Sequence, residues 1–391
     1  MARNSVGALM NVVSLFSGIG GLELGLENSG HRTILQCEIL PTAQAVLRHH
    51  FADVPLESDV TRIQALPNET DLICAGFPCQ DLSQAGKTQG LDGLSSGLIS
   101  EVFRLVKAFH LSTNRLPTLL LENVPFMLQL NGGSAMRTIL DNLEAFGYRW
   151  AYRVVDTYSF GLPQRRERVY LVASVEAEPA NILLSDDNPL TRPSTSIGEA
   201  AHGFYWTEGR TGLGWAPDAI PTLKNGSTIG IPSPPAILMP SGEVIKPDLR
   251  DAERLQGFTE NWTLPAEDVD RASKRWSLVG NAVSVPVAQW VGRRLQMPGI
   301  FDTSREMPFT EKGKLPRAAR GSLGERHAVS ISTDPVGTQP PGLAEFLNHN
   351  GTPLSLRAIT GFYSRTQKAK LRFPEGFIDA VRAHLTTMET A

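Results

Sequence analysis

The sequence predicts an α/β protein with a doubly wound, mostly parallel sheet and a smaller, irregular domain. Between residues 10 and 175, short apolar runs alternate with segments of helical periodicity. This alternation is typical of parallel strands joined by helices that cover both faces of one sheet. From about 176 to 245 the periodicity is lost, and proline, glycine and serine become frequent. Such a composition favours a loop-rich second domain.

Apolar runs with the length of strands occupy 10–16, 33–37, 71–76, 117–123, 148–156 and 168–174. Segments of helical periodicity occupy 22–30, 41–51, 98–109 and 135–147. The second of these begins with Pro41, a residue that the first turn of a helix tolerates well. Ligands of such sheets bind at the carboxyl ends of the strands, so residues that follow the strands are the first candidates for a site.

Helical periodicity returns at 247–258 and 284–296. We therefore predict an ordered domain over 1–175, completed by 276–298, and a loop-rich domain over 176–275. Residues 299–391 form a C-terminal extension that begins with a basic, proline-containing linker. Its basic residues include Lys312, Lys314, Arg317 and Arg320.

The composition is that of a soluble globular protein, with 41% hydrophobic and 20% charged residues in 391. No run approaches the roughly 18 apolar residues that span a membrane, and the N-terminus lacks the features of a signal peptide. Three cysteines are too few for a disulfide framework, which indicates the cytoplasm. The histidines show no zinc spacing, so we expect no metal.

The net charge of −3 does not by itself indicate a nucleic-acid-binding protein. Binding to DNA would need a local basic surface instead of a global excess of positive charge. Basic residues cluster at 164–168 and 312–320. A solvated surface or linker is the simpler interpretation of each cluster taken alone.

The glycine-rich segment FSGIGG (16–21) follows a strand and precedes a helix. Glycine allows a sharp turn there and a close approach of the backbone to a ligand. The segment fails the dinucleotide fingerprint, because Glu23 occupies the third glycine position. Glu38 ends the next strand and suits two ribose hydroxyls, and Asp59 suits an adenine amino group. Both acids could instead be helix caps, so a nucleoside cofactor remains one of two interpretations.

Cys79 lies in GFPCQ (76–80), directly after the strand at 71–76. A thiol held in a rigid turn at the ligand edge of a sheet suits a nucleophile, which must react as thiolate. Glu122 ends the strand at 117–123 and could donate a proton to a ring nitrogen. A single carboxylate there is more often a loop anchor, but its pairing with Cys79 favours acid–nucleophile chemistry.

These motifs resemble those of cytosine-5 DNA methyltransferases of the prokaryotic, restriction–modification type. FSGIGG, GFPCQ, ENV (122–124), QRRERVYLVA (164–173), RLQGF (254–258) and GNAVSVPVA (280–288) occur in the family's order and approximate spacing. The resemblance extends from residue 10 to about 296. It implies that 1–175, completed by 276–298, is a catalytic and cofactor-binding domain and that 176–275 is a target-recognition domain. It implies the fold of methyltransferases that depend on S-adenosylmethionine, and methyl transfer to carbon 5 of a cytosine flipped out of double-stranded DNA.

The resemblance also implies a role for individual residues. Cys79 matches the nucleophile that adds to carbon 6, and Glu122 matches the residue that engages ring nitrogen 3 and the exocyclic amine. Arg166 and Arg168 match the arginines that contact cytosine and the nearby backbone. The positions that match cofactor contacts are Phe16, Gly18, Gly20, Glu38, Ile39, Asp59, Pro78, Leu98, Asn281 and Val283.

Two roles remain open for the C-terminal extension at 299–391: further DNA contact through its basic residues, or packing on the smaller domain. Two other segments have expected roles in binding DNA. Residues 81–97 are rich in glycine and serine, and we predict that they close over flipped DNA, with Ser83 and Lys87 as contacts. The family's target choice comes from the region between QRRER and RLQGF, here about 176–249. Its PTLKNGS segment (221–227) resembles the family's Thr-Leu element, with Lys224 and Asn225 as DNA contacts. Base readout depends on side-chain geometry, so the target sequence does not follow from these residues.

Three rival interpretations are less favoured. The family branch that methylates transfer RNA carries a further Cys-Phe-Thr element, whereas this chain has no cysteine after Cys79. A DNA-binding regulator with an inactive methylation site predicts damaged motifs, but Cys79, Glu122, Arg166 and Asn281 are all in place. A dehydrogenase is disfavoured because Glu23 breaks the dinucleotide fingerprint. We therefore expect a monomeric DNA (cytosine-5-)-methyltransferase that protects DNA from a cognate restriction enzyme.

Overall fold

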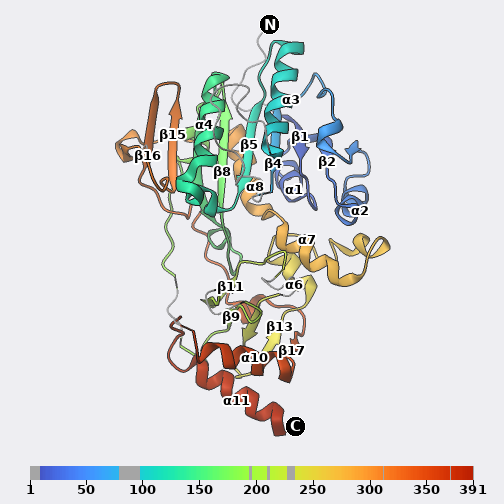
Figure 1. Ribbon diagram of the computed structural model, residues 1–391, viewed down its shortest axis with the longest axis vertical. Coiled ribbons are helices and arrows are strands. Elements are labelled where there is room, and N and C mark those ends of the chain that lie inside the picture. The colour runs from blue at the N-terminus through green and yellow to red at the C-terminus, as the bar shows by residue number, and fades with distance from the viewer. Residues whose placement is uncertain are drawn as a thin grey trace. The chain divides into compact units, whose positions relative to one another are not determined.

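The structure is a computed structural model that describes residues 9–78, 97–192, 196–208, 212–226, 234–310, 312–369 and 371–390. The chain divides into two compact units. The first consists of Met1–Asp156, Glu167–Pro189 and Val283–Gly337. The second consists of Thr157–Arg166, Leu190–Ala282 and Thr338–Ala391. Each unit therefore combines segments that lie far apart in the sequence (Figure 1).

A 10-stranded sheet forms the centre of the first unit. Its parallel half has the order β3 (Leu56–Glu57), β2 (Arg32–Cys37), β1 (Asn11–Leu15), β4 (Leu72–Gly76) and β5 (Thr118–Asn123). Its antiparallel half continues with β8 (Glu167–Ser174), β6 (Arg149–Asp156), β15 (Ala318–Ser322), β16 (Glu325–Val329) and β14 (Glu306–Pro308). The predicted α/β class is confirmed, and parallel pairing is confined to the first five of these strands.

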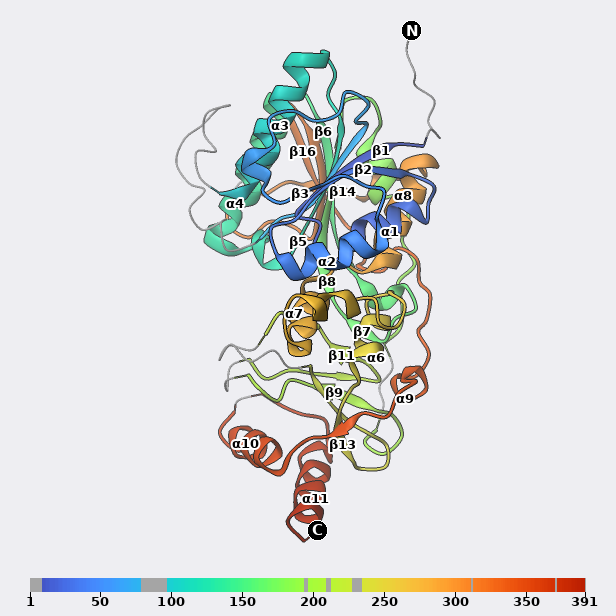
Figure 2. The ribbon, with the colours of Figure 1, turned by 90° about the vertical axis from the view of Figure 1, so that its right-hand side faces the viewer.

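Helices cover both faces of this sheet (Figure 2). On one face lie α3 (Leu98–Thr113) and α4 (Ser134–Ala145), which share a continuous apolar cluster with alternate residues of the strands, such as Val13 and Ile73. On the other face, α1 (Gly21–Glu27) packs against α8 (Val285–Gln296), which also contacts α5 (Pro179–Leu183). A Cβ at Gly25 would lie 2.4 Å from that of Ala288, so the α1–α8 contact requires a glycine. The first unit also contains helix α2 (Pro41–His50), which follows β2 in the chain.

The second unit contains a five-stranded antiparallel sheet. Its order is β10 (Trp215–Pro217), β9 (His202–Phe204), β12 (Ala236–Leu238), β13 (Val244–Lys246) and β17 (Thr352–Pro353). A separate parallel pair joins β7 (Gln164–Arg165) to β11 (Ile220–Pro221). The helices are α6 (Leu249–Arg254), α7 (Arg275–Asn281), α9 (Leu343–Phe346), α10 (Leu356–Thr366) and α11 (Phe377–Thr390). Strands of two or three residues are too short to produce a periodic pattern, which explains the irregular appearance of this region in the sequence.

The segment after residue 299 is divided between the two units. Its first part supplies β14, β15 and β16 of the large sheet. Arg317 pairs with Glu167 at 2.7 Å, and Arg320 pairs with Glu306 at 2.5 Å, so both arginines brace this sheet. The basic and proline residues of this part predicted a linker, because they interrupt the alternation of apolar and polar residues that marks a strand.

The last part of the chain packs on the small sheet, as one of the two open interpretations expected. The rings of Phe204 in β9 and Phe362 in α10 lie 4.5 Å apart, and Phe373 stacks on Phe377 of α11 at 4.9 Å. Phe204, Phe362 and Phe377 are fully buried, so α10 and α11 supply the core of the second unit. Among the described helices, none is long and apolar enough to cross a membrane.

Candidate active site and cofactor site

Glu122 lies at the carboxyl end of β5, in register with Gly76 of β4. Its side chain is largely buried, and Oε1 lies 3.2 Å from Nε of Arg168, at the start of β8. Gly76 leaves room for this carboxylate, because a Cβ there would lie 3.3 Å from Glu122 Oε2. The strand ends thus bring a carboxylate and a guanidinium together.

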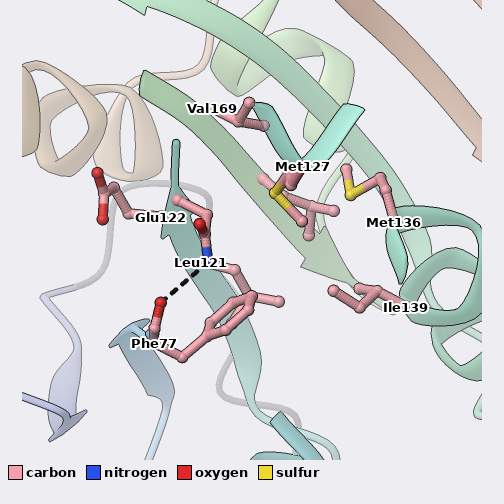
Figure 3. Close-up of a pocket in the computed structure, with 9 residues that line it drawn as sticks. Phe77, Leu121, Glu122, Met127, Met136, Ile139 and Val169 are labelled. Carbon is pink, nitrogen blue, oxygen red and sulfur yellow. Dashed lines mark hydrogen bonds between the residues drawn. The ribbon is translucent and has the colours of Figure 1, made fainter. Parts of the chain in front are cut away.

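Asn123, the residue after Glu122, ties β5 to the segment that leads to Cys79. Its Nδ2 donates to the carbonyl of Phe77 at 2.9 Å, and its Oδ1 accepts from the backbone N–H of Val124 at 2.8 Å. The first of these bonds is the dashed line in Figure 3. No role for Asn123 followed from the sequence, where its place within the ENV motif was the available signal.

A small cavity lies beside this bond. Its lining is mainly apolar and includes Phe77, Met127, Met136 and Ile139. The carboxyl group of Glu122 points away from Met127 and Met136 (Figure 3). The cavity therefore lies behind the acid, among the core side chains that support Phe77.

Cys79, Ser83 and Lys87 lie outside the described residues, as does most of the predicted mobile segment. The other two cysteines are buried. Burial, with the nearby Glu38 carboxylate adding to it, raises the pKa of Cys37 to about 12. Burial likewise raises the pKa of Cys74 well above its usual range. Both thiols therefore stay protonated at neutral pH and are poor nucleophiles.

The turn after β1 carries the glycine motif. Phe16, Gly18 and Gly20 have φ values of 59°, 56° and 87°, all in the left-handed region. A Cβ at Gly20 would approach the ring of Phe51 to 2.4 Å, whereas Gly18 faces open space. The backbone at Gly18 is therefore accessible to a ligand without a side chain in the way.

Glu38 connects this turn to the end of β2. Its Oε2 accepts from the backbone N–H of Gly18 at 2.7 Å, and its Oε1 accepts from that of Leu40 at 2.8 Å. Burial raises the pKa of Glu38, and these backbone donors oppose the rise. Each oxygen retains acceptor capacity, because a carboxylate oxygen can accept two hydrogen bonds. The neighbouring Ile39 is 68% exposed and offers an apolar surface beside the acid.

Asp59 caps a short 3₁₀ helix (Val60–Arg62). Its oxygen Oδ1 therefore has the role of a helix cap, which was the alternative to a cofactor contact. Oδ1 accepts from the N–H and hydroxyl of Thr61, and these bonds lower the pKa of Asp59. Arg104 of α3 holds the same turn by donating to the carbonyls of Val60 and Ile63. Among the other predicted cofactor positions, Pro78 is exposed, Leu98 begins α3 and Val283 is buried in the first unit.

Glu23 lies on α1, behind the glycine turn, and is fully buried. Burial raises the pKa of Glu23 to about 7; the hydroxyls of Ser14 and Ser17 lower it and the charge of Glu27 adds to the rise. Cys74 also faces this carboxyl group. The protein therefore holds Glu23 in its neutral form through much of the acidic range.

The stability of the protein is expected to fall as pH rises through the titration of Glu23. The folded form binds the proton more tightly than the unfolded chain does, so the contribution is complete below about pH 4.5 and lost above about pH 7. The shift corresponds to roughly 3 kcal/mol. The free energy of unfolding, measured with urea at several pH values across this range, should fall less steeply with pH in Glu23→Gln than in the native protein. Glu69→Gln, at an exposed acid, serves as the control, and an identical slope in Glu23→Gln and the native protein would contradict the expectation.

The remaining predicted residues lie in the second unit. Lys224 and Asn225 are exposed and follow β11. The ammonium of Lys224 lies 3.8 Å from the ring centre of Tyr205 and 3.3 Å from Glu208. Asn281 ends α7 and is exposed.

Arg166 differs from the expectation of an accessible arginine, because it is only 1% exposed. Its guanidinium donates to the carbonyls of Leu223, Gly280 and Ala282. Arg166 and Arg168 of QRRER thus belong to different units, Arg168 beside Glu122 and Arg166 among backbone carbonyls. No group of three or more metal-ligating side chains occurs among the described residues.

Comparison with known proteins agrees with these motifs. Residues 10–202 match the family model described as C-5 cytosine-specific DNA methylase. The chain is 45% identical over 382 residues to the Type II methyltransferase M2.BsuMI of Bacillus subtilis (strain 168), a match that covers 95% of this chain and 97% of the relative. The chain belongs to this family.

Further matches of this C-5 cytosine-specific DNA methylase are more distant. The Type II methyltransferase M.MspI of Moraxella sp is 29% identical, with 73% of this chain and 70% of the relative covered. Among solved structures, the Entamoeba histolytica methyltransferase EhMeth aligns with a TM-score of 0.49 at 15% identity, over 74% of this chain and 98% of that one. The methylase motifs and the relative that matches over nearly its full length therefore carry the assignment.

Proposed function

We propose that this methylase transfers a methyl group from S-adenosylmethionine to carbon 5 of a cytosine in double-stranded DNA, with Cys79 as nucleophile and Glu122 as acid. Its activity is that of a DNA (cytosine-5-)-methyltransferase. The observation that carries the proposal is the Glu122–Arg168 ion pair at the end of β5. The next residue, Asn123, donates a hydrogen bond to Phe77, which lies two residues before Cys79 in the chain. A stacked base is out of reach of such a site, so the cytosine must be flipped out of the duplex, at a cost of a few kcal/mol.

The chemistry follows from the residues of the chain. The Cys79 thiolate adds to carbon 6 of the ring, and the displaced electron pair moves to nitrogen 3, which takes a proton from Glu122. Arg168 holds the Glu122 carboxyl group in place for this transfer. Carbon 5 is then nucleophilic. When bound, S-adenosylmethionine would supply the electrophilic methyl group that carbon 5 takes, and would leave as a neutral thioether. A water molecule then removes the proton at carbon 5, the bond between the Cys79 sulfur and carbon 6 breaks, and Glu122 recovers its proton from nitrogen 3.

The glycine turn and Glu38 fit a nucleoside cofactor of this kind. Open space at Gly18 allows close approach of a ligand to the backbone, and Glu38 retains acceptor capacity for two ribose hydroxyls. The exposed side chain of Ile39 offers an apolar surface for a base. Phe16, Gly20, Asp59, Pro78, Leu98, Asn281 and Val283 are proposed as the further cofactor positions.

Glu38→Gln is expected to weaken S-adenosylmethionine binding at least about tenfold, since hydrogen bonds to charged acceptors contribute about 1.5–3 kcal/mol each. An amide has one acceptor oxygen and must turn its NH₂ group toward a ribose hydroxyl or a backbone N–H. Equilibrium binding of the cofactor measures the effect. The control is Glu57→Gln, an exposed acid paired in register with Cys37 in the neighbouring strand. Equal affinity of the two variants would remove Glu38 from the cofactor site.

Lys224 and Asn225 are proposed to contact DNA, together with Ser83 and Lys87. The relatives bear the name Type II methyltransferase, and we extend the proposal to protection of DNA from a cognate restriction enzyme. Bisulfite sequencing of DNA from cells that express the protein tests the function directly. Protected cytosines in one recurring sequence are expected, with none in cells that express Cys79→Ala. Absence of protected cytosines in the first sample would refute the function.

A further inference from the structure

We propose that Arg166, together with Gln164, is a positioning residue that fixes the recognition segment, residues 222–225, and does not contact the flipped cytosine. The inference rests on the proposed function, because it assigns the source of target discrimination in that reaction. It is drawn entirely from contacts within the second unit.

The recognition segment follows β11, which pairs with β7 in the register Ile220–Gln164 and Pro221–Arg165. Thr222 Oγ1 continues this alignment by donating to the carbonyl of Arg165 at 2.7 Å. The segment therefore starts from a fixed position beside the QRRER motif.

Gln164 and Arg166 hold both sides of one residue in the recognition segment. The backbone N–H of Leu223 donates to Gln164 Oε1 at 3.0 Å, and the carbonyl of Leu223 accepts from Arg166 Nη1 at 2.8 Å. All three residues are buried, so water does not replace a lost bond without rearrangement. The conformation at Leu223 is thus specified from the QRRER motif.

The same two side chains reach the later motifs of the family. Arg166 Nη2 donates to the carbonyls of Gly280 and Ala282, at 3.2 and 2.6 Å. Gln164 Nε2 donates to the carbonyl of Leu255 at 2.8 Å, within RLQGF. Three motifs that are distant in sequence therefore converge on two side chains.

Helix α7 also contacts the recognition segment, through the backbone of Gly280 and the hydroxyl of Ser277. A Cβ at Gly280 would lie 2.1 Å from the carbonyl oxygen of Lys224, so only glycine allows this contact. Ser277 Oγ donates to the carbonyl of Asn225 at 2.9 Å. Tyr205, whose hydroxyl donates to the carbonyl of Thr222 at 2.7 Å, holds the other end.

The backbone of the recognition segment is thus fixed, while the side chains of Lys224 and Asn225 are exposed. Base readout requires side chains at defined positions, because misplacement breaks the hydrogen-bond geometry. A planar guanidinium suits this positioning role, since it donates in several fixed directions, and the single ammonium of lysine does not.

The test compares Arg166→Lys with Arg168→Lys, which alters the arginine beside Glu122. Initial rates are measured on the target duplex found by bisulfite sequencing and on a duplex that differs by one base pair. Arg166→Lys should reduce the discrimination between the duplexes about tenfold and raise KM for DNA, while kcat and S-adenosylmethionine affinity change less than about threefold. Arg168→Lys should lower kcat and keep discrimination.

Loss of kcat in Arg166→Lys with discrimination retained would overturn the proposal, because it would indicate contact with the reacting base. Two milder variants, Tyr205→Phe and Ser277→Ala, each remove one hydrogen bond to the recognition segment and guard against a folding defect in Arg166→Lys. A partial loss of discrimination is expected in both, and full discrimination in both would also refute the positioning role. Failure of the proposed function itself would be distinguishable, because the native protein would then methylate neither duplex.

Discussion

Cys79→Ser is expected to lose the covalent complex with DNA and to lower turnover by at least about a thousandfold. A hydroxyl is almost entirely protonated at neutral pH, whereas a thiol supplies a useful fraction of thiolate. The measurement uses duplex DNA with 5-fluorocytosine at the target. Fluorine cannot leave carbon 5 as a proton does, so the adduct of the native protein persists under denaturing conditions and is resolved by electrophoresis.

Cys74→Ala is the matched control for this experiment. Cys74 is fully buried in β4, and its pKa is raised by burial, so it should contribute nothing to trapping. Trapping of the native protein and of Cys74→Ala, with none in Cys79→Ser, supports the assignment. If Cys79→Ser were trapped as efficiently as the native protein, another residue would have to be the nucleophile.

Glu122→Gln is expected to lower the rate of methyl transfer by about 10²–10⁴-fold, the range typical of a lost general acid. Glutamine has the same size and can still hydrogen-bond to the base, but it cannot supply a proton to nitrogen 3. Binding of the cofactor should be preserved, because Glu122 lies on β5, while the glycine turn and Glu38 follow β1 and β2. Single-turnover methyl transfer separates the chemical step from product release.

The control for Glu122→Gln is Asp71→Asn, which alters a partly exposed ion pair with Arg115 at the opposite edge of the sheet, directly before β4. This variant should keep the native rate, since an exposed pair contributes little to stability. An unchanged single-turnover rate in Glu122→Gln would exclude the acid from the mechanism.

The sequence alone determined the parallel half of the large sheet and the edge at which the candidate site lies. Apolar runs alternate there with helical segments over long stretches, and both periods are local properties of the chain. The carboxyl ends of parallel strands share one edge, so Gly18, Glu38 and Glu122 were placed together before any contact was known. The observed strands β1, β2, β4 and β5 and helices α1 to α4 confirm these predictions.

Only the tertiary structure decided how the distant segments are distributed. Strands β14, β15 and β16 extend the large sheet, while α10 and α11 complete the core of the second unit. The same holds for Arg166 and Arg168 of QRRER, whose environments the sequence does not distinguish. Arg168 meets Glu122, and Arg166 is buried among carbonyls of residues 223, 280 and 282. A periodic pattern records which face of an element is apolar, but the partner of a buried polar group comes from elsewhere in the chain and leaves no local trace in the sequence.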